Sequence, residues 1–137
     1  MRSTGAEAKL FMMVLVLVLI QSQSFLEKVH VTVINGLGNG RIMSIHCQSR
    51  DDDLGNHILP DGHATEWSFR VNIWGTTVFY CDVTWIDSSM HHFDAYSHRR
   101  DHNRCKRDCI WMIKDDGHLY AHNPDSGDWE FMPFENI

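Results

Sequence analysis

The chain has 137 residues, of which 43% are hydrophobic, and its formal net charge at pH 7 is −6. A chain of this length has room for one ordinary domain with a modest core. An acidic balance disfavours nucleic acid and anionic membrane surfaces as partners, because both repel a negatively charged protein. These properties favour a single small domain that binds neither of them.

The N-terminal segment is typical of a secretory signal. Leu10–Ile20 is a run of eleven apolar residues behind two basic residues, and it is shorter than the roughly 20 residues that span a bilayer as a helix. Small residues at Ser22 and Ser24 suit the two positions before a cleavage site. We therefore expect a signal peptide at 1–24, cleavage after Ser24 and a secreted domain at 25–137. An uncleaved membrane anchor is the alternative.

Strand patterns begin soon after this segment. Val29–Ile34 is rich in β-branched residues and ends at a glycine-rich turn, as strands often do. Arg41–Cys47 alternates apolar and polar residues, which is the pattern of a half-buried strand. The polar and acidic segment Ser49–Gly55 predicts a loop. A further strand is expected at Glu66–Ile73, with Ile73 among the residues on its apolar face.

The middle of the chain holds the longest strand pattern, Thr76–Ile86. Cys81 lies on the apolar face of this pattern, where a core disulfide would be. A shorter strand is expected at His92–Tyr96. The segment Ser97–Asp108 is dense in charge and predicts a loop.

The last third of the chain predicts a hairpin and an edge strand. Asp115–Gly117 joins Cys109–Lys114 to His118–His122, and Asp-Gly between alternating runs is a strong hairpin signal. Trp129–Phe134 is a short run whose proline suits a sheet edge. No helical periodicity follows the N-terminal segment. The whole pattern predicts an all-β fold, a small antiparallel β-sandwich of about seven to eight strands stabilised by disulfides.

Four cysteines, Cys47, Cys81, Cys105 and Cys109, predict two disulfides in an exported chain. Sequence alone allows three pairings. A bond between Cys105 and Cys109 would close only a tiny loop and constrain little, so we expect the pairs Cys47–Cys109 and Cys81–Cys105. A zinc site is the alternative, but structural zinc usually takes two closely spaced ligand pairs, and here one pair is close.

Ten histidines are the unusual feature of the composition, and His91, His92, His98 and His102 are close in sequence. His98 and His102 would share a face of a helix, but their segment does not look helical, so we expect no metal site. The run Asp51–Asp53 lacks the spacing of an EF-hand calcium loop. No Gly-x-Ser-x-Gly elbow is present. We expect neither catalytic residues nor a cofactor.

The segment from Asp94 to Arg107 is the best candidate for binding a partner, because it is charged and because Cys105 and Cys109 hold its end. A loop held by disulfides loses less entropy on binding than a free loop, and arginine and tyrosine are frequent at energetic hot spots. A merely solvated charged loop is the alternative. The candidate binding residues are Asp94, Tyr96, Arg99, Arg100, Asp101 and Arg104.

Several segments together resemble one known family. They are His30–Leu37, His46–Gly55, Trp67–Arg70, Asn72–Cys81 and Arg104–Trp111. Taken in order, they resemble the plant self-incompatibility S1 family, also called S-protein homologues. The resemblance covers nearly all of the expected mature chain and implies a small secreted β-sandwich with disulfides and no known catalytic activity. The family's founding members are stigma proteins that act as ligands for a pollen membrane receptor.

The residues and this resemblance together predict a secreted, ligand-like signalling or recognition protein. Its expected partner is a cell-surface receptor or another extracellular protein, bound through charged loops. We expect no binding to nucleic acid and no membrane insertion after signal removal. Two other classes stay open: a secreted defence or toxin-like protein, and a secreted enzyme that depends on its histidines.

Overall fold

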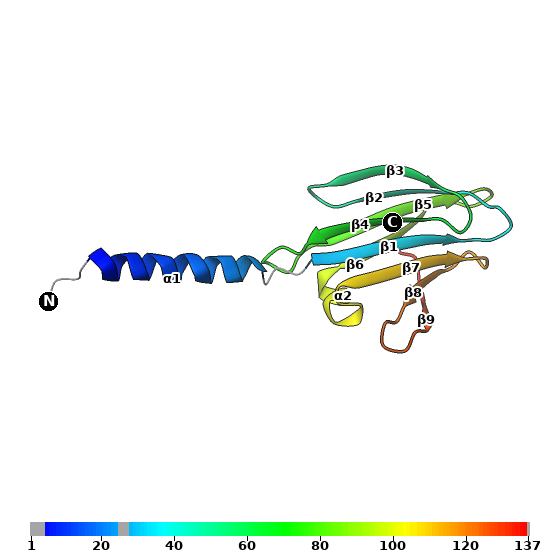
Figure 1. Ribbon diagram of the computed structural model, residues 1–137. Helices are drawn as coiled ribbons and strands as arrows, with labels where there is room; N and C mark the ends of the chain where they lie inside the picture. Colours follow the sequence, from blue (N-terminus) through cyan, green and yellow to red (C-terminus); the bar gives the residue numbers. More distant parts are fainter. Residues whose placement is uncertain (1–4, 25–27, 137) are drawn as a thin grey trace.

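The computed structural model describes residues 5–24 and 28–136. Gly5–Ser24 forms helix α1, which extends beyond one end of the folded domain (Figure 1). Its apolar side chains from Leu10 to Val18 are exposed. No helix within the two described ranges is long and apolar enough to cross a membrane. The predicted cleavage after Ser24 borders residues 25–27, which lie outside the described residues, so processing stays a prediction.

Nine strands in the described residues form two facing sheets (Figure 1). The five-stranded sheet has the order β4-β1-β7-β8-β9, and the four-stranded sheet has the order β3-β2-β5-β6. The predicted all-β sandwich is confirmed, with one strand more than expected. The elements are β1 (Lys28–Gly36), β2 (Met43–Gln48), β3 (Asp53–Leu59), β4 (Ala64–Arg70), β5 (Val78–Trp85), β6 (His91–Ser97), α2 (His98–Arg104), β7 (Asp108–Lys114), β8 (Leu119–His122) and β9 (Trp129–Met132).

One strand pair departs from the antiparallel pattern. β1 and β7 run parallel, from His30 opposite Asp108 to Gly36 opposite Lys114, whereas the other paired strands among the described residues are antiparallel. The chain reaches β7 from the opposite sheet, through α2 and not through a hairpin. A parallel neighbour needs such a crossover, and local sequence patterns do not reveal one.

The core lies between the two sheets and is built from alternating side chains of both. Val29, Val31 and Val33 of β1 are fully buried, and Trp111 of β7 is the largest fully buried side chain. The Trp111 indole Nε1 donates a 2.7 Å hydrogen bond to the carbonyl oxygen of Ala95 in β6. This bond ties the two sheets together and satisfies the one polar group of a buried tryptophan.

Two segments differ from their expected bounds. The segment Ser49–Gly55 was expected to be a loop, but β3 begins at Asp53 and forms an edge of the smaller sheet. Most side chains of β3 are exposed, so the strand has no apolar alternation that would reveal it. β4 ends at Arg70, and Ile73, which was expected on the apolar face, is 70% exposed.

The prediction of a charged loop at Ser97–Asp108 is wrong over its first part, where His98–Arg104 forms α2. The helix contains no apolar residue, so no hydrophobic periodicity marks it. Asp101 organises this segment by accepting hydrogen bonds from the Ser97 main-chain N–H at 2.9 Å and from Arg104 Nε at 2.7 Å. Buried polar contacts, rather than an apolar face, stabilise this short helix.

The predicted disulfide pairing is wrong. Cys47 of β2 and Cys81 of β5 lie directly opposite each other and are bonded, with a Cα–Cα distance of 4.1 Å. Cys105 and Cys109 form the second bond, because the turn after α2, with Lys106 at a φ of 59°, brings their Cα atoms to 5.1 Å. The predicted pair Cys47–Cys109 would join a cysteine of one sheet to a cysteine of the other.

A candidate recognition surface at one end of the sandwich

Three segments that are distant in sequence gather at one end of the sandwich. They are the β2–β3 loop (49–52), the β4–β5 loop (71–77), and α2 with the turn that follows it (98–107). The main-chain N–H of His98 donates a 3.1 Å hydrogen bond to the carbonyl oxygen of Thr77, which joins α2 to the β4–β5 loop. We call these three segments the loop end.

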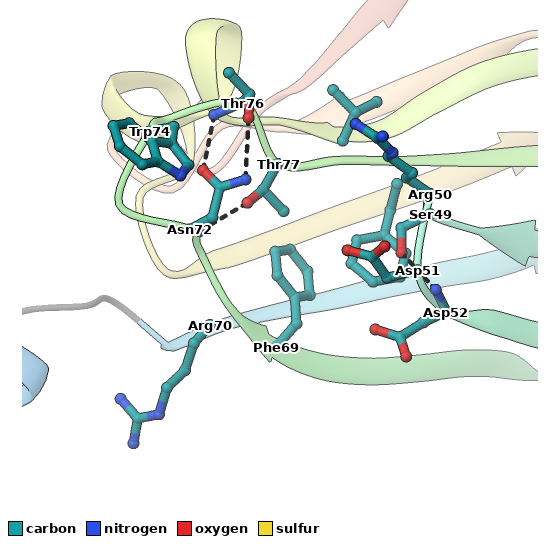
Figure 2. A pocket seen from close by; sticks show the side chains of 12 residues that line it. Ser49, Arg50, Asp51, Asp52, Phe69, Arg70, Asn72, Trp74, Thr76 and Thr77 are labelled. Atoms are coloured by element: carbon teal, nitrogen blue, oxygen red, sulfur yellow. Dashed lines mark hydrogen bonds between the residues drawn. The ribbon is translucent and has the colours of Figure 1, made fainter.

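A cavity of about 500 Å³ opens between the two loops of the loop end (Figure 2). The β2–β3 loop lines one side, and the β4–β5 loop, including Asn72 and Trp74, lines the other. Phe69 lies between the two sides in Figure 2, and Phe79 also lines the cavity. An aromatic floor inside a polar rim is suited to receiving part of a partner molecule.

The β4–β5 loop is held by hydrogen bonds from one asparagine. Asn72 Oδ1 accepts a 3.0 Å bond from the Thr76 main-chain N–H, and Asn72 Nδ2 donates a 3.0 Å bond to Thr76 Oγ1. The Asn72 main-chain N–H donates a 2.8 Å bond to Thr77 Oγ1. Gly75 takes a φ of 67°, and a Cβ there would come within 3.0 Å of the His98 ring. The hydrogen bonds of Asn72 and the glycine at position 75 therefore fix the conformation of this loop.

This ordered loop presents two large apolar side chains to solvent. Ile73 is 70% exposed and Trp74 is 79% exposed. A tryptophan on a preformed loop buries a large area when it docks and loses little conformational entropy. Arg70, at the base of the same loop, also lines the cavity. The loop therefore combines exposed apolar side chains with a basic residue, as many binding surfaces do.

Basic residues are concentrated near this end of the molecule. Arg41 and Lys114 lie at or near the opposite strand ends. The other eight basic residues of the segment 28–136 lie on the loop end or on strand ends beside it. They are Lys28, Arg50, Arg70, Arg99, Arg100, Arg104, Lys106 and Arg107. At one such strand end, Lys28 of β1 lies opposite Arg70 of β4. A chain that is acidic as a whole thus carries most of its positive charge at one end.

Three of the predicted binding residues form an ion cluster around a buried carboxylate. Asp101 is fully buried, and Arg100 donates to both of its carboxylate oxygens at 2.8 and 2.7 Å. The guanidinium carbons of Arg100 and Arg104 lie 5.2 and 4.9 Å from the Trp111 ring centroid. Burial acts to raise the pKa of Asp101, but hydrogen bonds from Arg100, Ser97 and Arg104 outweigh it and hold this pKa below its usual value. These groups stabilise the fold.

The other predicted binding residues divide between core and surface. Tyr96, a candidate binding residue, is fully buried in β6, so its ring does not reach a partner at the surface. Asp94 is half-buried on β6. Arg99 of α2 is exposed, and it is the predicted residue whose side chain remains available on the loop end.

The comparison with known proteins decides the family. The model of the family described as plant self-incompatibility protein S1 matches residues 30–133. The chain belongs to this family. The resemblance found in its sequence segments is thereby confirmed.

Relatives of this S1-family chain include proteins of Papaver rhoeas and Arabidopsis thaliana. It is 39% identical over 111 residues to self-incompatibility protein S1 of Papaver rhoeas, a match that covers 80% of this chain and 79% of that protein. It is 42% identical over 87 residues to S-protein homolog 5 of Arabidopsis thaliana, covering 64% of this chain and 66% of that protein. The match to S-protein homolog 2 of the same plant spans 56% of that protein.

A solved structure supports the fold of this S1-family chain. It is that of a self-incompatibility protein homologue, and it matches with a TM-score of 0.58 and 19% identity, covering 83% of this chain and 95% of that chain. Its family is described as small, highly stable, secreted proteins from plants. The predicted secretion of this chain agrees with that description.

Sequence reasoning missed the exposure of Trp74 in this S1-family chain. It continued the apolar pattern of β4 through Ile73 and gave Trp74 no role. A usable signal was present, because Asn72 followed by Gly75, Thr76 and Thr77 has the composition of a hydrogen-bonded turn. Recognising that turn would have ended the strand at Arg70 and placed Trp74 on a loop.

The histidines of this S1-family chain are dispersed among several contacts. His98 and His102 do share a helix face, contrary to expectation, and their rings stack at 4.9 Å. His91 stacks between Trp85 and Phe134. His92 instead hydrogen-bonds an aspartate on the neighbouring strand. The four histidines that are close in sequence thus face different surroundings.

Proposed function

We propose that this chain is a secreted, ligand-like recognition protein that binds a protein partner at a cell surface through its loop end. Membership of the S1 family supports this role, as does the name of its relative in Papaver rhoeas, self-incompatibility protein S1. The observation that carries the proposal is Trp74, which is 79% exposed on a loop held by Asn72. We propose binding, and no catalytic step, as the activity of this surface.

The loop end also indicates what kind of partner surface it fits. Trp74 and Ile73 are exposed in the free protein. An apolar pocket on the partner would bury them on binding. Arg50, Arg70 and Arg99 lie on the loop end or beside it and are exposed, so the rim of that pocket should carry acidic side chains. We therefore propose an extracellular protein domain with an acidic-rimmed hydrophobic pocket, such as the outer part of a receptor.

A binding assay on membranes tests the role of Trp74. The full chain is expressed in plant cells, purified from the medium and measured for saturable binding to plasma-membrane fractions from tissues of the same plant. Trp74→Ala should weaken binding by about 2 kcal/mol or more, which is roughly 30-fold. Ile86→Ala is the matched control, because Ile86 is 73% exposed but follows β5 at the opposite end.

A charge reversal tests the basic rim separately. Arg99→Glu should weaken binding and reduce its dependence on salt, since a rim charge steers association. Arg100→Glu is unsuitable, because Arg100 binds buried Asp101 and its loss would disturb folding. The proposal fails if Trp74→Ala and Arg99→Glu both bind as the wild type does. It also fails if Ile86→Ala weakens binding as much as Trp74→Ala.

A further inference from the structure

A histidine and three carboxylates gather on the smaller sheet, outside the three segments of the loop end. His92 lies on the edge strand β6, and Asp82 lies directly opposite it on β5. Asp94 lies two residues further along β6. The C-terminal segment adds Glu135, whose main-chain N–H donates a 2.7 Å hydrogen bond to the carbonyl oxygen of His92. Two strands and the chain end thus contribute to one cluster.

Asp82 orients the His92 ring. His92 Nδ1 lies 2.8 Å from Asp82 Oδ1, which is hydrogen-bond distance. His92 Nε2 points toward Glu135 but lies 4.0 Å from its nearest oxygen, which is too far for a hydrogen bond. A carboxylate on one ring nitrogen, with the other nitrogen left for a ligand, is the arrangement that typically supports a metal-binding histidine.

The ligand atoms of this cluster are close enough to share one ion. One atom each from His92, Asp94 and Glu135 lie within 4.8 Å of one another. Ligands of a tetrahedral zinc ion stand about 3.4 Å apart, as bond lengths near 2.1 Å require. Small side-chain rotations would bring the three ligand atoms from their present separations to the distances that zinc requires. The Glu135 side chain is 44% exposed and is free to make them.

The cluster also has an excess of negative charge. Asp94 interacts electrostatically with Glu135, His92, Arg100 and Asp101. Arg100 is the one arginine among these groups, and its hydrogen bonds go to the Asp101 carboxylate and to the Asp94 main-chain carbonyl. It does not bond the Asp94 carboxylate. A bound cation would relieve the repulsion between Asp94 and Glu135.

We propose that His92, Asp94 and Glu135 bind one zinc ion, with Asp82 positioning the histidine. One nitrogen and two carboxylate oxygens suit zinc better than calcium or magnesium, which prefer oxygen ligands alone. Water would take the fourth position, as in zinc sites with three protein ligands. The ion would fasten the C-terminal segment to the exposed edge of β6.

Zinc titration of the secreted protein tests this site. The full chain is expressed in plant cells without a histidine tag, purified from the medium, stripped with chelator and titrated with zinc chloride by calorimetry. We expect one zinc ion per chain and slower hydrogen exchange at the Glu135 amide. Glu135→Gln and Asp94→Asn should each weaken binding at least tenfold, and Asp82→Asn should weaken it about 10- to 100-fold.

Control variants distinguish this site from adventitious binding. His102→Ala removes an exposed histidine that stacks on His98 and should leave zinc affinity unchanged. The proposal is overturned if no stoichiometric binding occurs, which would make His92 an ordinary ion-pair partner. It is also overturned if Glu135→Gln, whose fold is checked by circular dichroism, binds as the wild type does, or if His102→Ala abolishes binding. Equal competition by calcium would likewise exclude a zinc site.

Discussion

Arg104 Nε donates a 2.7 Å hydrogen bond to the fully buried carboxylate of Asp101. The same guanidinium lies 4.9 Å from the Trp111 ring centroid, so it joins the short helix α2 to the core. Arg100 makes the same two kinds of contact, a hydrogen bond to Asp101 and an approach of 5.2 Å to the Trp111 ring centroid. A charged segment of the sequence thus becomes a structural support within the loop end.

Replacing Asp101 should destabilise the protein. Asp101→Asn leaves two partly buried guanidiniums without their carboxylate, and breaking a buried ion pair by removing one partner costs about 3 kcal/mol or more. The free energy of unfolding is measured in urea with the disulfides intact. Asp115→Asn, at an exposed turn position, is the control and should change stability little. Equal stability of both variants would contradict the structural role of Asp101.

The same carboxylate should make stability depend on acidity. Hydrogen bonds from Arg100, Ser97 and Arg104 hold the pKa of Asp101 below its usual value despite burial. Its contribution is therefore complete above the unfolded pKa of about 3.9 and is lost as the pH falls through the lower folded pKa. Unfolding measured from pH 6 to pH 2 should show a smaller loss of stability in Asp101→Asn than in the wild type. Parallel curves would contradict this prediction.

The two disulfides should differ in their effect on stability. Cys47–Cys81 closes a segment with a sequence separation of 34, and Cys105–Cys109 closes one with a separation of 4. Chain entropy predicts losses of about 4 and about 2 kcal/mol on replacing each pair by serine. Denaturant unfolding of the two double variants measures this order. Peptide mapping of the unreduced protein checks the pairing, and a Cys47–Cys109 peptide would contradict it.

Asn72 should govern the order of the loop that carries Trp74. Asn72→Ala removes two side-chain hydrogen bonds to Thr76 and should lower global stability by only about 1 kcal/mol per bond. Amide exchange at Thr76 should become much faster, and partner binding should weaken although Trp74 is still present. Thr84→Ala, a half-buried position near the C-terminal end of β5, is the control. Unchanged exchange at Thr76 would show that other contacts hold the loop.

Processing of the N-terminus is a separate prediction. Protein recovered from the medium of plant cells should begin at Phe25, because Ser22 and Ser24 suit the positions before the cleavage site. N-terminal sequencing or intact mass measures this directly. Protein that remains in the membrane fraction with α1 attached would instead support the uncleaved anchor.

Local patterns in this chain were enough to reveal most of its strands. Alternation between apolar and polar residues identified β1, β2 and β5, with Cys81 correctly on the core face of β5. The Asp115–Gly117 turn revealed the β7–β8 hairpin. Such features could be predicted because a strand places successive side chains on opposite faces, whatever lies next to it. The family followed from segments read in order along the chain.

Contacts between distant segments settled the remaining features. Cys47 pairs with Cys81 because β2 and β5 are neighbours in this register, and no local pattern states which strands are neighbours. Asp101 and Tyr96 look like surface residues in sequence, yet both are fully buried. Ile73 was expected on the apolar face of a strand and is 70% exposed. Burial depends on what the rest of the chain packs against a residue, and that is decided only when the two sheets close on each other.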